Sequence, residues 1–129
     1  MTWGKVKTEV DAQTAEAIDR FVSHADELSA NYFKEMNYTH ANPPIHKAEY
    51  CEKWCKVWTY EERGGKLIKS SIYAFICIID NETRALGVCK LGDIHKPAGC
   101  NAPAKTARGS VYQVDLTTCI GPHGVVYLR

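Results

Sequence analysis

The sequence predicts an α+β fold: a long N-terminal helix packed on a small antiparallel β-sheet, followed by a basic C-terminal loop or short helix. Three observations support this expectation. Apolar residues recur with helical spacing over residues 8–36, and period-two alternation begins near residue 48. The chain of 129 residues is also long enough for a core of its own, so we expect residues 1–129 to form a single domain.

The helix is predicted over residues 8–36 because neither Gly nor Pro interrupts this stretch. Thr8 with Asp11 resembles a capping box in which Asp replaces the usual Glu, so we expect the helix to begin there. Its outer face is acidic. The apolar or small residues of the inner face are Val10, Ile18, Phe21, Val22, Ala25, Leu28, Tyr32, Phe33 and Met36.

A first strand is predicted over residues 48–60, after a breaker segment (residues 37–46) that contains two consecutive prolines. Aromatic side chains fall on one side of the alternation, and small or apolar ones fall on the other. The aromatic residues are Tyr50, Trp54, Trp58 and Tyr60, and those on the other side are Cys51, Cys55 and Val57. An aromatic stripe of this kind is usually sheet core or subunit interface, and only sometimes a platform on which bases stack. Trp54 and Trp58 are the candidates for such a platform.

A turn at Gly64–Gly65, where both residues can take positive φ, leads into a second strand over residues 67–79. Its end is apolar on both faces, which is typical of a central strand that is covered on both sides. Residues 84–90 are expected to pair with this strand as a third strand, and residues 111–116 are expected to form a short one.

The segment 92–109 combines small residues, which permit close approach to the main chain, with lysine and arginine side chains. Residues 102–108 could begin as a helical turn with Pro103 at its first position. Lys105 and Arg108 would then share one face and cradle an anion together with free backbone N–H groups. By composition alone, an ordinary solvated loop explains the segment about as well.

The charge distribution favours a small anionic ligand over duplex DNA. The net charge is +1, but residues 1–36 hold four Lys/Arg against seven Asp/Glu, whereas residues 90–129 hold five against two. The sequence has no apolar run that suggests a membrane span and no apolar region typical of a secretory signal. We therefore expect a cytoplasmic protein that does not contact a membrane.

The six cysteines are expected to be reduced and to act as small core hydrophobes. A zinc site built from Cys51, Cys55 and His46 is conceivable, but no CxxC pair is present. His40 and His46 of the breaker segment are separate candidate metal ligands, without a paired Cys or carboxylate at a useful spacing. We therefore predict neither a metal nor a cofactor.

Enzymatic interpretations have little support in the sequence, which contains no GxSxG, HExxH or P-loop motif. Cys100 with His95 or His123 could form a thiol–imidazole pair, but nothing supplies a third, orienting group. Binding without turnover is the better prediction.

The motifs GDIHKPAG and APAKTARGSVY, with the terminal IGPHGVVYLR, resemble those of a group of small phage-encoded proteins. The match covers roughly the last 60 residues and the preceding YAF of Tyr73–Phe75. Cys100 stands where this group has an aromatic residue, and Thr106 stands where it has a histidine. The chain is thus similar to the anti-Thoeris sponge family, which binds and sequesters cyclic ADP-ribose isomers and in some members cyclic oligonucleotides.

This resemblance implies a homo-oligomer without catalytic activity that acts in the cytoplasm of the infected host. Lys105 and Arg108 would bind the diphosphate, Lys96 would add charge, and Asn101 and Thr106 would bond ribose or base. Phe75 could stack on adenine, although its apolar surroundings favour burial in the core. The expected ligand-binding residues are Phe75, His95, Lys96, Asn101, Lys105, Thr106 and Arg108.

Two alternatives remain open at the level of the sequence. One is a phage accessory protein that binds nucleic acid through Trp54, Trp58 and the basic segment. The other is a small hydrolase that acts on the same nucleotides.

Overall fold

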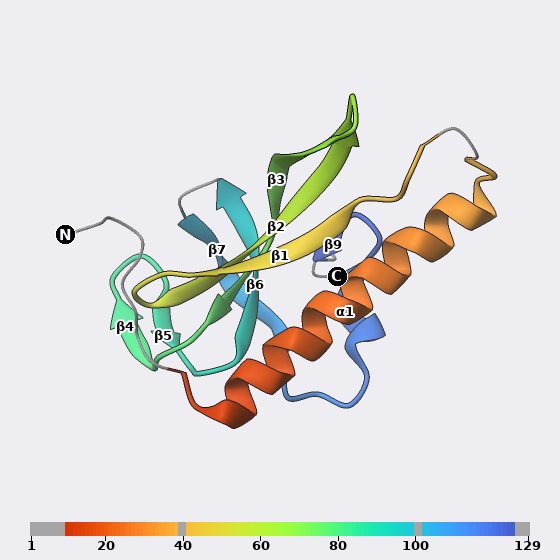
Figure 1. The fold of residues 1–129 in the computed structure, drawn as a ribbon. Coiled ribbons are helices and arrows are strands. Elements are labelled where there is room, and N and C mark those ends of the chain that lie inside the picture. Colours follow the sequence, from red (N-terminus) through yellow and green to blue (C-terminus); the bar gives the residue numbers. More distant parts are fainter. Residues whose placement is uncertain (1–9, 39–40, 100–101, 126–129) are drawn as a thin grey trace.

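The computed structural model describes residues 10–38, 41–99 and 102–125. Within these ranges one α-helix lies against a five-stranded antiparallel sheet of order β1-β2-β3-β6-β7, with two small two-stranded sheets beside it (Figure 1). The α+β prediction is therefore confirmed. The elements are α1 (Ala12–Glu35), β1 (Ile45–Tyr50), β2 (Trp54–Arg63), β3 (Lys66–Cys77), β4 (Asn81–Thr83), β5 (Gly87–Cys89), β6 (Asp93–Gly99), β7 (Ala102–Ser110), η1 (Leu116–Thr118), β8 (Ile120–Gly121) and β9 (Gly124–Val125).

The helix α1 begins one turn later than the sequence suggests. Asp11 is its N-cap, and the Asp11 carboxylate accepts a hydrogen bond of 2.6 Å from the Thr14 N–H. Thr8 lies outside the described residues. The helix ends before Asn37, whose φ of 62° is the left-handed conformation that often stops a helix. Ile18, Phe21 and Ala25 of the predicted inner face are buried, together with Thr14 and Ser29, which the apolar pattern did not include. Met36, at the C-terminal end of that pattern, is exposed instead.

The core lies between α1 and one face of the sheet. Cys55 and Val57 of β2 point to this side, as their alternation predicts. The segment 111–125 closes the core at one end, and Arg20 of α1 holds it by donating a hydrogen bond of 2.7 Å to the Val111 carbonyl. Trp54, Lys56 and Trp58 alternate with the core residues and therefore belong to the opposite face of the sheet, which α1 does not cover.

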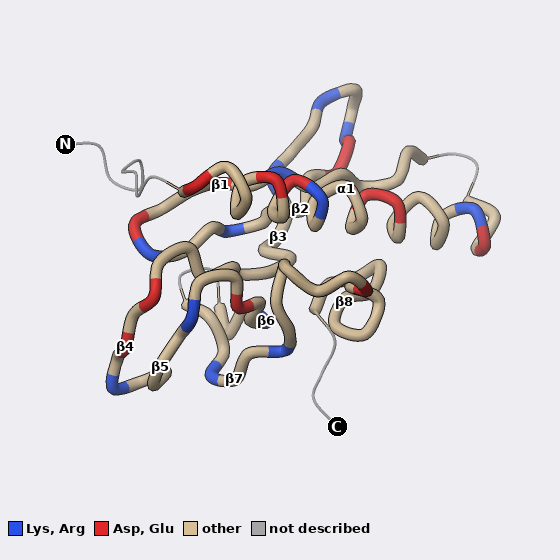
Figure 2. The backbone as a smooth tube through the Cα atoms, turned by 90° about the horizontal axis from the view of Figure 1, so that it is seen from below, with Lys and Arg blue, Asp and Glu red and all other residues tan. Residues whose placement is uncertain are grey.

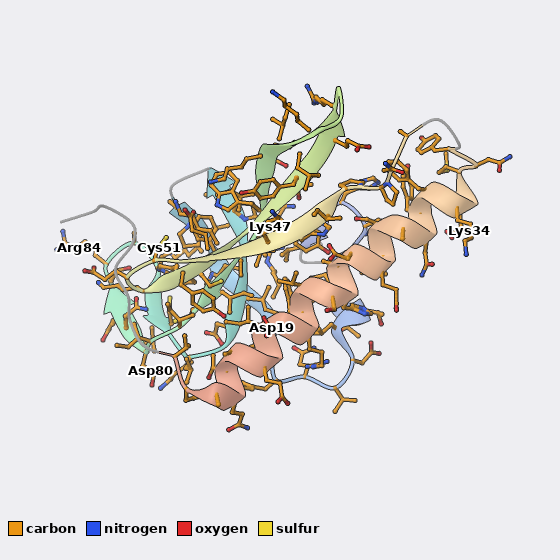
Figure 3. All side chains as sticks on the ribbon, in the orientation of Figure 1. Asp19, Lys34, Lys47, Cys51, Asp80 and Arg84 are labelled. Atoms are coloured by element: carbon orange, nitrogen blue, oxygen red, sulfur yellow. The ribbon has the colours of Figure 1, made fainter. Side chains whose placement is uncertain are left out.

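The prediction of one strand over residues 48–60 is wrong, because the chain forms a hairpin there. β1 and β2 pair in antiparallel register, and the Cys51 N–H bonds the Trp54 carbonyl at 2.9 Å to close the turn. Cys51 lies at this turn (Figure 3). The next turn agrees with the sequence: Gly64 and Gly65 take φ values of +59° and +80° between β2 and β3.

The predicted third strand also pairs elsewhere. β5 pairs with β4 in a separate hairpin, whereas β6 is the strand that pairs with β3. The excursion closes where the Gly92 N–H returns to the Cys77 carbonyl at 2.7 Å and the Leu91 N–H bonds the Asp80 carboxylate at 2.6 Å. β4 and β5 therefore hydrogen-bond to each other in a local hairpin, and the edge of β3 is free to pair with β6.

The expected basic loop or short helix is a β-strand. Residues 102–110 form β7, which pairs with β6 at the edge of the sheet. Residues 111–116, expected as a strand, contain turns and the start of η1 instead. Figure 2 shows the charge asymmetry in space: α1 carries five acidic and two basic residues, whereas β7 carries two basic residues and no acidic one. Within the described residues, no helix is long and apolar enough to cross a membrane.

Candidate functional site

The five-stranded sheet forks at its centre. β3 pairs with β6 only at Phe75–His95 and Ile76–Ile94, while the hairpins β2–β3 and β6–β7 both continue past this point (Figure 1). Between the diverging hairpins lies a cleft with a volume of about 330 Å³. Its lining residues are Trp58, Ser70, Ser71, Ile72, Pro97, Ala98 and Gly99.

One wall of this cleft is an indole that carries a lysine. The Trp58 N–H donates a hydrogen bond of 2.8 Å to the Glu49 carboxylate, which fixes the plane of the ring. The Lys69 ammonium lies 4.4 Å from the centre of the same ring. At an exposed position such a cation–π contact contributes about 0.5 to 1 kcal/mol. Trp58 is thus a rigid aromatic surface under a mobile positive charge.

The other wall consists of small residues at the end of β6. Pro97, Ala98 and Gly99 have no charged or long side chain, so the main chain itself forms the surface. Within the part of the chain that the structure describes, no atom outside the adjoining residues lies within 4 Å of a Cβ built on Gly99. The main chain at Gly99 therefore has the open space that close approach of a ligand would need.

Two glycines of the same segment serve internal packing instead. A Cβ on Gly92 would lie 2.5 Å from Cε2 of Tyr112, and a Cβ on Gly109 would lie 2.5 Å from Oε1 of Gln113. The chain packs tightly against itself at both positions. Their lack of a side chain is therefore explained without any ligand.

Three lysines lie over aromatic rings on or beside this face of the sheet. Besides Lys69 on Trp58, the Lys47 ammonium lies 4.8 Å from the ring centre of Tyr60, and the Lys56 ammonium lies 5.9 Å from that of Phe75. Lys47 is labelled on β1 in Figure 3. Aromatic rings interleaved with lysines suit ligands that combine a flat ring with a negative charge.

Phe75 and His95 form the closed root of the fork. Both are nearly inaccessible, at 1% and 2% exposure, and Trp54 packs its ring edge-on to each, at centroid distances of 6.1 Å and 5.1 Å. His95 Nδ1 lies 2.7 Å from the Ala104 carbonyl oxygen and therefore carries the hydrogen, while Nε2 has no partner among the described residues. Neither residue lines the cleft, and Phe75 is covered as a core residue would be.

The basic side chains of the predicted site do not converge on a helical turn, because β7 is extended. Lys105 and Thr106 are exposed, and Arg108 Nε donates a hydrogen bond of 3.3 Å to the Thr106 carbonyl. Neither the cleft of the fork nor a smaller one of about 170 Å³ beside Arg20 is lined by these three residues. Asn101, like Cys100, lies outside the described residues.

Lys96 has a structural contact. Its ammonium donates a hydrogen bond of 3.0 Å to the Val125 carbonyl of β9, on the core side of the sheet. β9 contacts both β3 and β6, so it lies behind the fork. Lys96 is thus half-buried and engaged with the protein's own main chain.

The conceivable zinc ligands are held apart by other contacts. His46 is buried and its Nδ1 lies 2.8 Å from an Asp26 carboxylate oxygen, which also accepts the His46 N–H at 2.7 Å. Burial raises the pKa of the Cys55 thiol to about 12, so this sulfur stays protonated at neutral pH. Within the described residues, no group of three His, Cys, Asp or Glu side chains is placed to hold a metal ion.

The site residues that sequence reasoning missed are Lys69, Ser70 and Ser71 of β3. Trp58 was a candidate stacking platform, as part of the aromatic stripe. Pro97 to Gly99 belong to the segment 92–109, in which small residues predicted close approach to the main chain. The cleft joins these two signals, and only the divergence of β3 from β6 brings them together. That divergence has no signature in the local sequence.

Comparison of the chain with protein-family models, curated proteins and solved structures finds no match.

Proposed function

We propose that the protein binds and retains a small nucleotide ligand with a phosphate group in the cleft of the fork, without converting it. The observation that carries this proposal is the pairing of an aromatic surface and a cation, Trp58 with Lys69, opposite a wall of small residues. A base has a flat ring that stacks on an indole, and a phosphate needs a positive charge nearby. Nucleotides combine the two.

In this arrangement the base lies on Trp58 and the phosphates lie near Lys69. The Ser71 hydroxyl is then available to ribose, and the Ser70 oxygen, whose hydrogen is donated to Glu61, can still accept a hydrogen bond. Because Gly99 offers open space beside its main chain, the sugar and phosphates can lie close to β6. The volume of about 330 Å³ suits a ligand of nucleotide size.

Retention rather than turnover follows from the chemistry of the lining. Among the described residues, those that line the cleft include no His, Cys, Asp or Glu side chain that could act there as general acid or base, and the Lys69 ammonium beside them is assigned to the phosphates. The Ser70 hydroxyl is 3.2 Å from the Glu61 carboxylate, which also bonds Arg63 at 3.0 Å. Arg63 holds the pKa of Glu61 below its usual value, which makes this carboxylate a weak base.

The class of ligand that we propose is the cyclic ADP-ribose isomers, as the resemblance to anti-Thoeris sponges implies. Such a ligand carries an adenine and a diphosphate, which match Trp58 and Lys69. A phage protein that intercepts this signal would act in the cytoplasm of the infected cell. Its assembly into a homo-oligomer remains a prediction from the same resemblance, and light scattering of the purified protein tests it.

A retention experiment tests the proposal. The purified chain is incubated with a cyclic ADP-ribose isomer, freed of unbound molecules on a desalting column and denatured, and the released material is analysed by mass spectrometry. We expect the intact ligand in stoichiometric amount. Hydrolysed products would establish an enzyme instead, and the absence of retained ligand would refute the proposed ligand class.

Matched variants locate the site. Trp58→Ala removes the stacking surface, and we expect it to abolish retention. Tyr60→Ala is the control: the Tyr60 ring lies on the same strand and also has a lysine over it, but it does not line the cleft. Retention by Tyr60→Ala together with its loss in Trp58→Ala supports binding in the cleft, whereas equal effects would contradict it.

One observation favours a second candidate, the binding of single-stranded nucleic acid. The uncovered face of the sheet carries several rings with lysines over them, and successive bases stack on such a surface. Fluorescence anisotropy with a labelled oligonucleotide tests it. This function requires affinity that rises with oligonucleotide length and falls steeply with salt. A cyclic dinucleotide that binds as tightly as a long strand would exclude it.

A further inference from the structure

The contact between Lys69 and Trp58 has a consequence for the choice of ligand. The ammonium covers one face of the indole, 4.4 Å from the ring centre. A base and the ammonium cannot both lie on this side of the ring. Any ligand that stacks there must first displace Lys69.

We propose that Lys69 is a specificity-determining residue that admits anionic ring ligands to Trp58 and disfavours neutral ones. This inference rests on the proposed function. A neutral ligand such as adenosine displaces the ammonium without offering it a partner. A nucleotide displaces it and provides phosphate oxygens, to which the same ammonium can bond.

The surroundings of Lys69 support this role. Among the described residues, no carboxylate lies within ion-pair distance of its ammonium. Two glutamates of the neighbouring strands have other partners: Glu49 accepts the Trp58 indole N–H, and Glu61 accepts hydrogen bonds from Ser70 and Arg63. The indole is therefore the resting place of an otherwise uncommitted cation.

The mobility of Lys69 follows from its position. It lies on the part of β3 beyond the fork, where residues 66–71 are all exposed. A lysine has four rotatable bonds, and an exposed cation–π contact is weaker than stacking of a base on an aromatic ring. The ammonium can therefore leave the ring while the strand stays in place.

Calorimetric titration of the full chain with cyclic ADP-ribose and with adenosine tests the inference. In Lys69→Ala, we expect the affinity for cyclic ADP-ribose to fall about tenfold, because a charge-assisted bond to phosphate is lost. The affinity for adenosine should rise about two- to fivefold, because the competing cation has gone. Opposite changes for the two ligands are the signature of this role.

Two further variants serve as controls. Lys66→Ala removes a positive charge from the same exposed part of β3 without touching Trp58, and both affinities should stay within twofold of wild type. Lys69→Arg keeps the positive charge and should therefore retain the preference for cyclic ADP-ribose over adenosine that Lys69→Ala loses.

The outcomes separate this inference from the proposed function. If Lys69→Ala lowers the affinity for both ligands equally, or for neither, Lys69 does not select between them, although binding of a nucleotide in the cleft is not contradicted. If the wild type binds neither ligand and Trp58→Ala changes nothing, both the proposed function and the role of Lys69 are refuted.

Discussion

The ammonium of Lys96 in β6 bonds the carbonyl oxygen of Val125 in β9 at 3.0 Å, and this contact ties the fork of the sheet to the C-terminal hairpin. The resemblance to the sponge family implies that Lys96 adds positive charge to the ligand site. Its half-buried ammonium bonds the protein's own main chain, and we therefore expect it to contribute to stability. The carbonyl would lose a charged donor if the side chain were removed.

We therefore expect Lys96→Met to lower the free energy of unfolding by about 1 to 3 kcal/mol, as loss of a hydrogen bond to a charged group does. Urea denaturation measures the change. Lys105→Met, which replaces an exposed lysine on the neighbouring strand, is the control and should alter stability by less than about 0.5 kcal/mol. A Lys96→Met chain as stable as wild type would contradict the structural role.

The two possible locations of the binding site predict opposite rankings of variants. If the ligand lies in the cleft, Trp58→Ala abolishes binding, and the double variant Lys105→Ala with Arg108→Ala weakens it only about two- to threefold through lost long-range attraction. If the ligand lies on β7, as the charge of that segment suggests, the double variant is the one that abolishes binding.

Direct titration of each variant with cyclic ADP-ribose distinguishes the two locations. Folding of both variants is checked by circular dichroism, since Trp58 is half-buried. A complete loss of binding in the double variant, with normal binding by Trp58→Ala, would place the site on β7 and exclude the cleft.

How much the sequence predicted depended on how local the interactions are. The helix, the placement of Cys55 and Val57 on the same side of their strand and the Gly64–Gly65 turn follow from spacing and turn chemistry, and the structure confirms them. Each depends on residues that are near one another in the chain. The same reasoning placed the N-cap three residues early, because Thr8 and Asp11 are both good caps.

Strand partners could not be predicted in this way. The choice of β6 over β5 as the neighbour of β3 depends on where the chain returns at Gly92. The segment 102–108 consists mainly of small residues with no strong preference, and pairing with β6 makes it a strand. The fork, and with it the cleft, is a product of that pairing and has no local pattern.

A pH dependence of stability follows from the buried His46 and its partly exposed partner Asp26. Burial lowers the pKa of His46 in the folded state, and the nearby Asp26 carboxylate only partly opposes this. A group whose pKa is lowered by folding takes up protons more readily when unfolded. Its contribution is therefore present above the unfolded pKa of about 6.5 and is lost as the pH falls.

Denaturation at pH 7.5 and at pH 5.5 measures this effect. We expect the wild type to be less stable at the lower pH, and His46→Gln to show a smaller difference between the two values. Asp26→Asn removes the carboxylate that favours the charged imidazole. The free energy of unfolding of this variant should therefore decrease more than that of the wild type when the pH is lowered from 7.5 to 5.5. An equal pH dependence in wild type and His46→Gln would show that other groups cause it.

Two glycines of the basic segment should respond differently to the same substitution. At Gly92, φ is +93° and an added Cβ would lie 2.5 Å from the Tyr112 ring, so both the backbone and the packing oppose alanine. We expect Gly92→Ala to lower the free energy of unfolding by about 1 to 3 kcal/mol. Gly99 has open space around it, so Gly99→Ala should leave stability within about 0.5 kcal/mol of wild type.

Gly99→Ala should nevertheless lower the affinity for the ligand, because the new methyl group narrows the cleft opposite Trp58. Thermal denaturation and titration with cyclic ADP-ribose, carried out on both variants, measure the two effects separately. A stable Gly99→Ala chain with reduced affinity indicates that the ligand approaches the main chain of β6. If its affinity is unchanged, the ligand does not reach this wall, and the small residues of β6 have no part in binding.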